Sequence, residues 1–251
     1  MDERIKSIRM EEERSHKELY EKETLYAGES WLKKPVNTVM ELLGQFDGRE
    51  NFTALDLGCG VGRNAVAIAL HFRGRDCQID CVDLLPMAVE KLLENGKRYG
   101  VEDALRGEVS SIEAFPIREA CYDLILAVSA LEHAESEEAL KTTLAGIAAG
   151  VKQSGLVCLI MNTAVKERDI QTGQEFPAQF EVNLPTKELK ELLDGTFKGW
   201  EVLKETEVPQ RYEIPRGEMT SLLETVVVTY VCKKRQLFYK NMQPASIFDE
   251  R

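Results

Sequence analysis

Short apolar runs alternate with longer amphipathic segments through the middle of the chain. Apolar runs of this length are typical of buried parallel strands, and apolar positions spaced three and four apart are typical of helices. The alternation implies an α/β fold with a doubly wound, mostly parallel sheet that helices cover on both faces. Strands are predicted near 53–57, 78–82, 104–109, 122–128 and 155–161, and helices over 62–71, 86–99 and 137–150.

The two ends of the chain depart from this alternation. Residues 3–24 are rich in Glu, Lys and Arg and predict an exposed helix with local charge pairs, either loosely held or folded over the site. An amphipathic helix is expected around 35–43, and no clear pattern covers 163–184. The last third otherwise predicts a helix over 186–193 and an antiparallel pair of strands over 200–205 and 223–233.

The most informative stretch joins the first strand to the first helix of the alternation. It places Asp56 before three glycines at alternate positions, Gly58, Gly60 and Gly62. Glycines permit a tight turn and remove side chains where a ligand approaches the backbone. A dinucleotide fingerprint would need glycine where Arg63 stands, and a phosphate-binding loop would end in Gly-Lys-Ser/Thr. An acid before the glycines suits a ligand that carries an ammonium group.

A second strand-like run ends in Asp83, at the distance from the glycines where an acid accepts hydrogen bonds from two ribose hydroxyls. The alternative for Asp83 is the N-cap of the helix that follows, and both roles can coexist. A nicotinamide enzyme also places an acid here, so Asp83 predicts a nucleoside and not a particular cofactor. Asp80, in the same run, is expected to be a solvated strand residue.

With these residues, the chain resembles the class I S-adenosylmethionine-dependent methyltransferases, whose first motif is an acid followed by three alternate glycines. Segments 107–116 and 122–133 match further motifs in the same order, and the resemblance covers roughly residues 30–233. It implies a seven-stranded sheet with an antiparallel last strand and S-adenosylmethionine as cofactor. We expect a helical cap over 1–45, a methyltransferase domain over 46–235 and a C-terminal extension over 236–251.

The resemblance also implies a set of cofactor-binding residues. The backbone of the glycine turn faces the amine and sulfur end, with Cys59 as a small spacer. Ser111 and Ile112 face the adenine amino group and ring, with Glu113 as a rival to Ser111. The helix start near Asn64 suits the methionine carboxylate. The expected cofactor set is Asp56, Gly58, Cys59, Gly60, Asn64, Asp83, Leu84, Ser111, Ile112 and Val128.

The acceptor end of the site is less defined by sequence. His133 ends the second further motif, and its ordinary pKa suits a general base; the alternative is a histidine that shapes the pocket. Tyr26, Trp31, Arg63 and Arg211 are candidate acceptor-binding residues, with packing or loop roles as the alternatives.

A narrower resemblance points to the tellurite-resistance-type and thiopurine-type methyltransferases. It rests on the Gly-Arg-Asn at 62–64, on 199–204 and on the end of the last strand. It implies a soft chalcogen acceptor, with 163–184 and 207–219 shaping the acceptor pocket.

Composition limits the classes of molecule that the protein is expected to bind. A net charge of −11 with no dominant basic block disfavours a large nucleic acid substrate, and no apolar run approaches the ~20 residues that span a bilayer. The first residues form no apolar signal segment, so a cytoplasmic location is expected. Six cysteines in mostly apolar runs are expected to be free thiols, and three scattered histidines predict no metal site.

The favoured function is therefore methyl transfer from S-adenosylmethionine to a small-molecule acceptor. Two alternatives remain open at this point. One is a nicotinamide oxidoreductase with a degenerate fingerprint, against which Arg63 and Asp56 argue. The other is a non-catalytic module of the same fold that binds the cofactor. The sequence leaves it open, because transfer of the methyl group by in-line displacement requires no particular protein residue.

Overall fold

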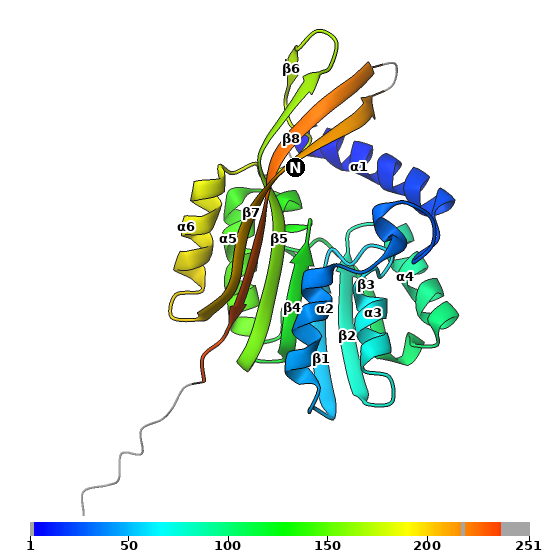
Figure 1. The fold of residues 1–251 in the computed structure, drawn as a ribbon, viewed down its shortest axis with the longest axis vertical. Coiled ribbons are helices and arrows are strands. Elements are labelled where there is room, and N and C mark those ends of the chain that lie inside the picture. The colour runs from blue at the N-terminus through cyan, green and yellow to red at the C-terminus, as the bar shows by residue number, and fades with distance from the viewer. Residues whose placement is uncertain (1–2, 217–218, 237–251) are drawn as a thin grey trace, which may run out of the picture.

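The computed structural model describes residues 3–216 and 219–236. Its strands form one sheet in the order β3-β2-β1-β4-β5-β8-β7, with the short β6 paired to β5 (Figure 1). The predicted C-terminal extension lies outside the described residues, apart from its first position. The strands are β1 (Asn51–Leu57), β2 (Asp76–Asp83), β3 (Leu105–Val109), β4 (Tyr122–Val128), β5 (Val151–Asp169), β6 (Glu175–Phe176), β7 (Glu201–Arg216) and β8 (Met219–Lys233).

Strand directions confirm the predicted fold class. β1 to β5 pair in parallel, whereas β8, the last strand, runs antiparallel to both β5 and β7. Parallel strands buried on both faces explain the near-continuous apolar runs, since every residue of β4 except Val128 is fully buried.

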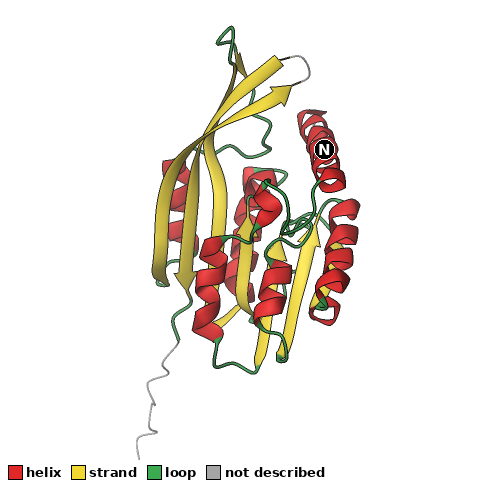
Figure 2. Ribbon diagram, turned by 45° about the vertical axis from the view of Figure 1, so that its right-hand side comes forward, coloured by secondary structure: helices red, strands yellow, loops and turns green. Residues whose placement is uncertain are grey.

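Helices cover both faces of the sheet (Figures 1 and 2). Leu124 and Leu126 of β4 belong to a core with α2, α3 and α4, while Ile125 between them belongs to a core with α5 and α6. Side chains alternate between faces along a strand, so one apolar run supplies both cores. The helices are α1 (Glu3–Lys22), α2 (Asn37–Leu43), α3 (Ala65–His71), α4 (Pro86–Tyr99), α5 (Glu137–Gly150) and α6 (Thr186–Thr196), with short 3₁₀ turns η1 (Trp31–Lys33), η2 (Gly44–Phe46), η3 (Glu102–Ala104) and η4 (Leu131–His133).

Local signals explain why the helix predictions in the middle of the chain are accurate. α4 begins with Pro86 and ends before Gly100, whose φ of 64° is the left-handed conformation of a common helix stop. The side chain of Ser136 caps α5 by accepting a hydrogen bond from the Ala139 amide.

The sequence underestimates the late strands. β5 continues to Asp169 and β7 to Arg216, so these strands form an extension of the sheet beyond the ends of its other strands (Figure 1). In this part of β5 the inward positions include Thr163, Glu167 and Asp169, which are buried although polar. Glu167 is satisfied there by the Ser221 hydroxyl at 2.6 Å. Polar residues on the inward face hide the alternation that predicts a strand.

Asp80 is not the solvated residue that the sequence predicted. Its side chain accepts hydrogen bonds from the Tyr122 hydroxyl at 2.8 Å and the Arg118 guanidinium at 2.5 Å. β2 lies between β1 and β3, so it is an interior strand, and Asp80 on it is buried. Asp80 therefore makes a structural ion pair below the sheet's functional end.

The charged helix α1 lies beyond the carboxyl ends of the central strands (Figures 1 and 2). Only Ile5, Ile8 and Tyr20 of its 20 residues are buried. Local ion pairs such as Lys6 with Glu3 support it, as the sequence predicted. In the described part of the chain, no helix is both long enough and apolar enough to span a lipid bilayer.

Candidate functional site

A cavity of about 520 Å³ opens at the carboxyl ends of β1, β2 and β4, with residues of α1 along one side. Open α/β sheets bind ligands at this edge, where the loops leave the parallel strands. Most of the predicted cofactor residues line this cavity: Gly58, Cys59, Gly60, Asn64, Asp83, Leu84, Ser111, Ile112 and Val128.

The glycine turn is fixed by backbone conformation and by packing. Gly58, Gly60 and Gly62 have φ values of 71°, 53° and 89°, which side chains rarely adopt. A Cβ on Gly58 would lie 2.4 Å from the Cβ of Ala130, and one on Gly62 would lie 2.6 Å from Leu92 Cδ1. Only Gly58 and Gly60 line the cavity, so Gly62 serves the approach of α4 and not a ligand.

The structure does not bring the Asp56 side chain to the cavity. Asp56 is 1% exposed, and its carboxylate accepts a hydrogen bond from the Ala65 amide at the start of α3. Burial, together with the charge of Asp83, raises the pKa of Asp56 to about 7. Asp56 therefore supports the turn from behind, and the predicted contact with a ligand ammonium group does not follow from this geometry.

Asp83 connects the ends of β1 and β2. Its Oδ2 accepts the Gly60 amide at 2.8 Å and its Oδ1 accepts the Leu85 amide at 2.9 Å. Burial raises the pKa of Asp83, although these two hydrogen bonds oppose the shift. Leu85 and not Asp83 occupies the N-cap position of α4. A carboxylate has about four lone-pair sites, so both oxygens of Asp83 keep capacity for ribose hydroxyls.

The remaining candidate cofactor-binding residues differ in the exposure and the partners of their side chains. Ile112 is buried and Leu84 is 39% exposed, and both present apolar surface to the cavity. Asn64 lines the cavity, but its Oδ1 already accepts the Val36 amide at 3.0 Å. Cys59 is buried, and burial raises the pKa of its thiol well above the ordinary value, as expected for a spacer that is no nucleophile.

The candidate acceptor residues are separated by the fold. Trp31 and Arg63 line the cavity, with the Arg63 guanidinium 5.2 Å from the centre of the Trp31 ring. Tyr26 does not line it, because its hydroxyl donates to the Arg63 carbonyl and its ring packs on Tyr99. Arg211 is exposed and paired with Glu224 at 2.9 Å; the neighbouring Tyr212 lines the cavity in its place.

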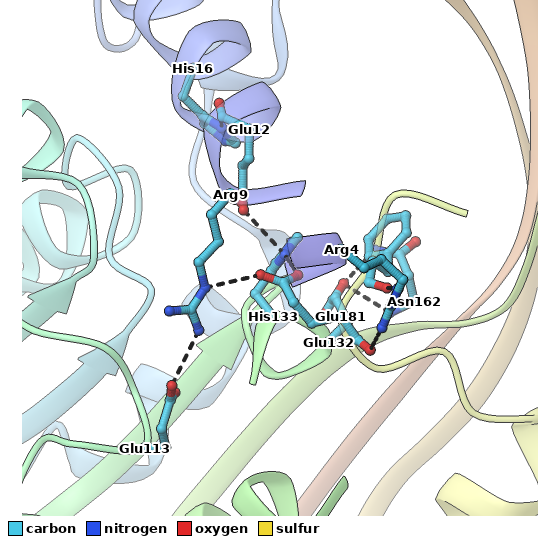
Figure 3. A network of polar contacts seen from close by, with 10 residues as sticks. Arg4, Arg9, Glu12, His16, Glu113, Glu132, His133, Asn162 and Glu181 are labelled. Carbon is cyan, nitrogen blue, oxygen red and sulfur yellow. Dashed lines mark hydrogen bonds and ion pairs between the residues drawn. The ribbon is translucent and has the colours of Figure 1, made fainter. Parts of the chain in front are cut away.

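His133 lies in a cluster of charged side chains (Figure 3). Its Nδ1 is 2.9 Å from Glu181 Oε2 and 3.3 Å from Glu12 Oε2. Burial lowers the pKa of His133, but the hydrogen bond to Glu181 and the charges of Glu12, Glu132 and Glu181 outweigh burial and raise it to about 9. The ring is therefore a cation at neutral pH, which does not favour the general base that the sequence predicted.

Sequence reasoning missed the other members of this cluster. Arg9, Glu12, His16 and Tyr20 of α1 line the cavity, and Glu181 lies in the loop before α6. Arg9 Nε is 3.3 Å from Glu181 Oε1, and Arg9 Nη2 is 3.3 Å from Glu113 Oε1. A charged helix has no pattern that tells which of its charges turn inward, so no signal in the chain identifies these residues.

Glu12, His133 and Glu181 also offer ligand atoms that lie within 4.8 Å of one another. Imidazole and carboxylate are ligands for divalent cations, but a metal ion would have to displace the Nδ1 proton of His133. Arg9 and the charged His133 already compensate Glu181. We describe the group as an ion-pair cluster, and the expected absence of a metal stays a prediction.

Comparison with known proteins identifies the domain that forms this site. The family model described as "Methyltransferase domain" matches residues 54–155, from β1 to the start of β5. This matched stretch is similar to methyltransferase domains. Its fold is that of the class I S-adenosylmethionine-dependent methyltransferases, as the sequence motifs predicted.

Two curated relatives and one solved structure show the extent of the similarity. A carboxy-S-adenosyl-L-methionine synthase from Shewanella pealeana is 28% identical over 138 residues, which is 55% of this chain and 55% of the relative. Norajmaline N-methyltransferase from Rauvolfia serpentina is 30% identical over 84 residues, 34% of this chain and 28% of the relative. TehB from Haemophilus influenzae matches with a TM-score of 0.61 and 19% identity over 80% of this chain and 62% of its own.

The chain thus spans about half the length of one of these curated relatives and less of the other. Similarity is concentrated in the methyltransferase domain, and the structural match shows the fold. Neither α1 nor the extension formed by the late strands falls within the matched family model.

Proposed function

We propose that the protein is an S-adenosylmethionine-dependent methyltransferase that acts on a small-molecule acceptor. One observation carries the proposal: the glycine turn, Asp83 and a cluster of polar side chains line a single cavity of about 520 Å³. That volume lies within the ~300–1,000 Å³ typical of small-molecule sites. The methyltransferase domain and the relative that is an N-methyltransferase support the same class of reaction.

The residues present fit an adenosyl cofactor. Asp83 would accept the ribose hydroxyls, since it lines the cavity and each of its oxygens keeps a lone pair beside the backbone amide that it accepts. Ser111 and Ile112 would face the adenine, and the backbone at Gly58 and Gly60 would face the amino acid end. When bound, this cofactor supplies an electrophilic methyl group with a neutral leaving group.

The chain's own contribution is then position and exclusion of water. The cavity is bounded by the loops after the β-strands on one side and by α1 on the other. This enclosure would hold an acceptor against the methyl group. Residues 1–45 act in this proposal as the helical cap, and residues 46–235 as the catalytic domain. Tyr20 brings the cap close to the glycine turn, because its hydroxyl lies 3.1 Å from where a Cβ on Gly60 would stand.

We propose that His133 is a positioning residue at neutral pH. In its charged state it holds Glu12 of α1 and Glu181 of the loop before α6 together. The neutral ring, which accepts a proton, becomes the major form only above about pH 9. The displacement then proceeds at neutral pH without a base from this residue.

Calorimetry with S-adenosylhomocysteine and with NAD tests the cofactor. We expect S-adenosylhomocysteine to bind and NAD to bind far more weakly, because Arg63 stands where a dinucleotide turn needs glycine. Turnover of S-adenosylmethionine to S-adenosylhomocysteine with a panel of small acceptors then separates an enzyme from a non-catalytic binding module. Preferred binding of NAD would overturn the proposal.

A further inference from the structure

Three carboxylates meet at the acceptor end of the cavity, around the ring of His133 (Figure 3). Glu12 comes from α1, Glu132 precedes His133 in η4, and Glu181 comes from the loop before α6. Glu181 and Glu132 are buried, whereas Glu12 keeps 25% of its side chain exposed. Glu12 is therefore the carboxylate of this group that an entering molecule can reach.

The cations at this end do not neutralise the acids. Arg9 bridges Glu181 and Glu113, and Arg4 donates to the backbone carbonyls of Phe180 and Glu181. Around His133, the three cations Arg4, Arg9 and charged His133 face the four carboxylates of Glu12, Glu113, Glu132 and Glu181. Arg63, a further cation that lines the cavity, lies over the Trp31 ring. Burial raises the pKa of Glu12, and the charge of His133 opposes that shift. An anion that entered here would meet a net negative charge in a partly buried site, where charge interactions are strong.

Aromatic surface adjoins the carboxylates. The Phe180 ring stacks on His133 with centres 5.4 Å apart, and Tyr212 and Trp31 line the same cavity. Tyr212 is 47% exposed, so its ring face is open to a ligand, whereas the Trp31 ring already holds the Arg63 guanidinium. Carboxylates beside open aromatic faces favour an organic cation.

The reaction itself moves positive charge toward these groups. An aliphatic amine, which is an ammonium ion at neutral pH, first releases its proton to water. The neutral nitrogen then attacks the methyl carbon, its lone pair forms the N–C bond and the electrons of the C–S bond remain on sulfur. Sulfur becomes neutral and the nitrogen becomes an ammonium, which leaves as the methylated product and loses its proton to water. Carboxylates near the nitrogen thus stabilise the transition state more than the neutral acceptor.

We propose that the acceptor atom is the neutral nitrogen of a small aromatic or aliphatic amine, with Glu12 facing the ammonium that forms. The proposal rests on the proposed function and deepens it. It opposes the soft chalcogen acceptor that the narrower resemblance predicted, because these carboxylates would repel a thiolate or an oxyanion.

A binding experiment tests the charge preference without turnover. Protein saturated with S-adenosylhomocysteine is titrated with benzyltrimethylammonium, benzyl alcohol and phenylacetate, which share a ring and differ in charge. We expect the cation to bind about tenfold more tightly than the anion, with the alcohol between them. Glu12→Gln should weaken binding of the cation about fivefold and leave binding of the alcohol unchanged. Glu13 is an exposed acid on the same helix, and Glu13→Gln should change neither affinity.

A turnover experiment tests the acceptor atom. Benzylamine and benzyl mercaptan are compared as acceptors in one assay, with methylated products measured by mass spectrometry. Methylation of benzylamine in preference to the thiol supports the proposal. Preference for the thiol, or tighter binding of phenylacetate than of the cation, overturns it while leaving the methyltransferase function intact. Failure of S-adenosylhomocysteine to bind is detected in the first titration and overturns the proposed function itself.

Discussion

The two ends of the cavity are built in different ways. At the cofactor end, backbone amides of the glycine turn bond to Val82 and Asp83, at the tip of the adjacent strand. At the acceptor end, charged side chains from α1 reach residues that follow by more than a hundred positions, as Arg9 does with Glu113 and Glu181. Backbone geometry is rigid and specific, whereas long charged side chains adapt to each other. The first end suits a fixed cofactor and the second suits an acceptor that must enter and leave.

The contrast predicts its largest effect at Gly58. Gly58→Val places a β-branched side chain at a φ of 71°, with its Cβ 2.4 Å from Ala130. Strain and overpacking together should destabilise the protein by about 4 kcal/mol and abolish binding of S-adenosylhomocysteine. Thermal unfolding and calorimetry measure the two losses.

Gly48→Val is the matched control, since a Cβ on Gly48 has no neighbour within 4 Å. We expect this variant to keep its stability and its cofactor affinity within a small margin. A Gly58 variant that bound cofactor like the control would show that the turn adapts, and the contrast between the two ends would fail.

Substitution of His133 is expected to have an intermediate effect, on the free energy of unfolding and not on cofactor affinity. Because the pKa of His133 in the folded protein is raised to about 9, its stabilisation is complete below about pH 6.5 and is lost as pH rises through about 9. His133→Gln should therefore cost at most about 3 kcal/mol at pH 6 and little at pH 9.5.

Chemical denaturation across this pH range measures the gap between wild type and His133→Gln. Affinity for S-adenosylhomocysteine should change less than about twofold in the variant, since His133 belongs to the acceptor end. A gap that is constant with pH would contradict the ion-pair cluster, and a large loss of cofactor affinity would make His133 a cofactor-binding residue.

The smallest effect concerns Asp83. Asp83→Asn removes the charge but keeps the size of the side chain. We expect it to weaken binding of S-adenosylhomocysteine by about 2 kcal/mol, because the ribose hydroxyls lose their charged acceptor. Asp76→Asn, at the exposed start of the same strand, is the control. Calorimetry that finds equal affinity in the two variants would remove the ribose assignment.

Local signals account for what could be predicted of the fold and the cofactor end. The glycines, Pro86 and Gly100 each impose a backbone conformation that depends on neighbouring residues alone. Asp83 is the last residue of β2, and the carboxyl ends of parallel strands meet at one edge of the sheet. Asp56 is the exception, because its position in the motif did not show that its side chain packs behind the turn.

The acceptor end was mostly beyond prediction. Arg211 and Tyr212 are adjacent in the chain, yet only Tyr212 lines the cavity. The alternation in the part of β7 beyond the predicted strand decides between them. Likewise nothing in residues 3–24 indicates that Arg9 and Glu12 turn toward Glu181.

The sequence by itself determined the parallel sheet, the glycine turn and the site of Asp83, because these follow from apolar runs and from backbone conformations of single residues. Only the tertiary structure decided which charges surround the acceptor, since α1 and the loop before α6 become neighbours through packing alone. It also decided their protonation, because the pKa of His133 depends on carboxylates that lie far from it in the chain.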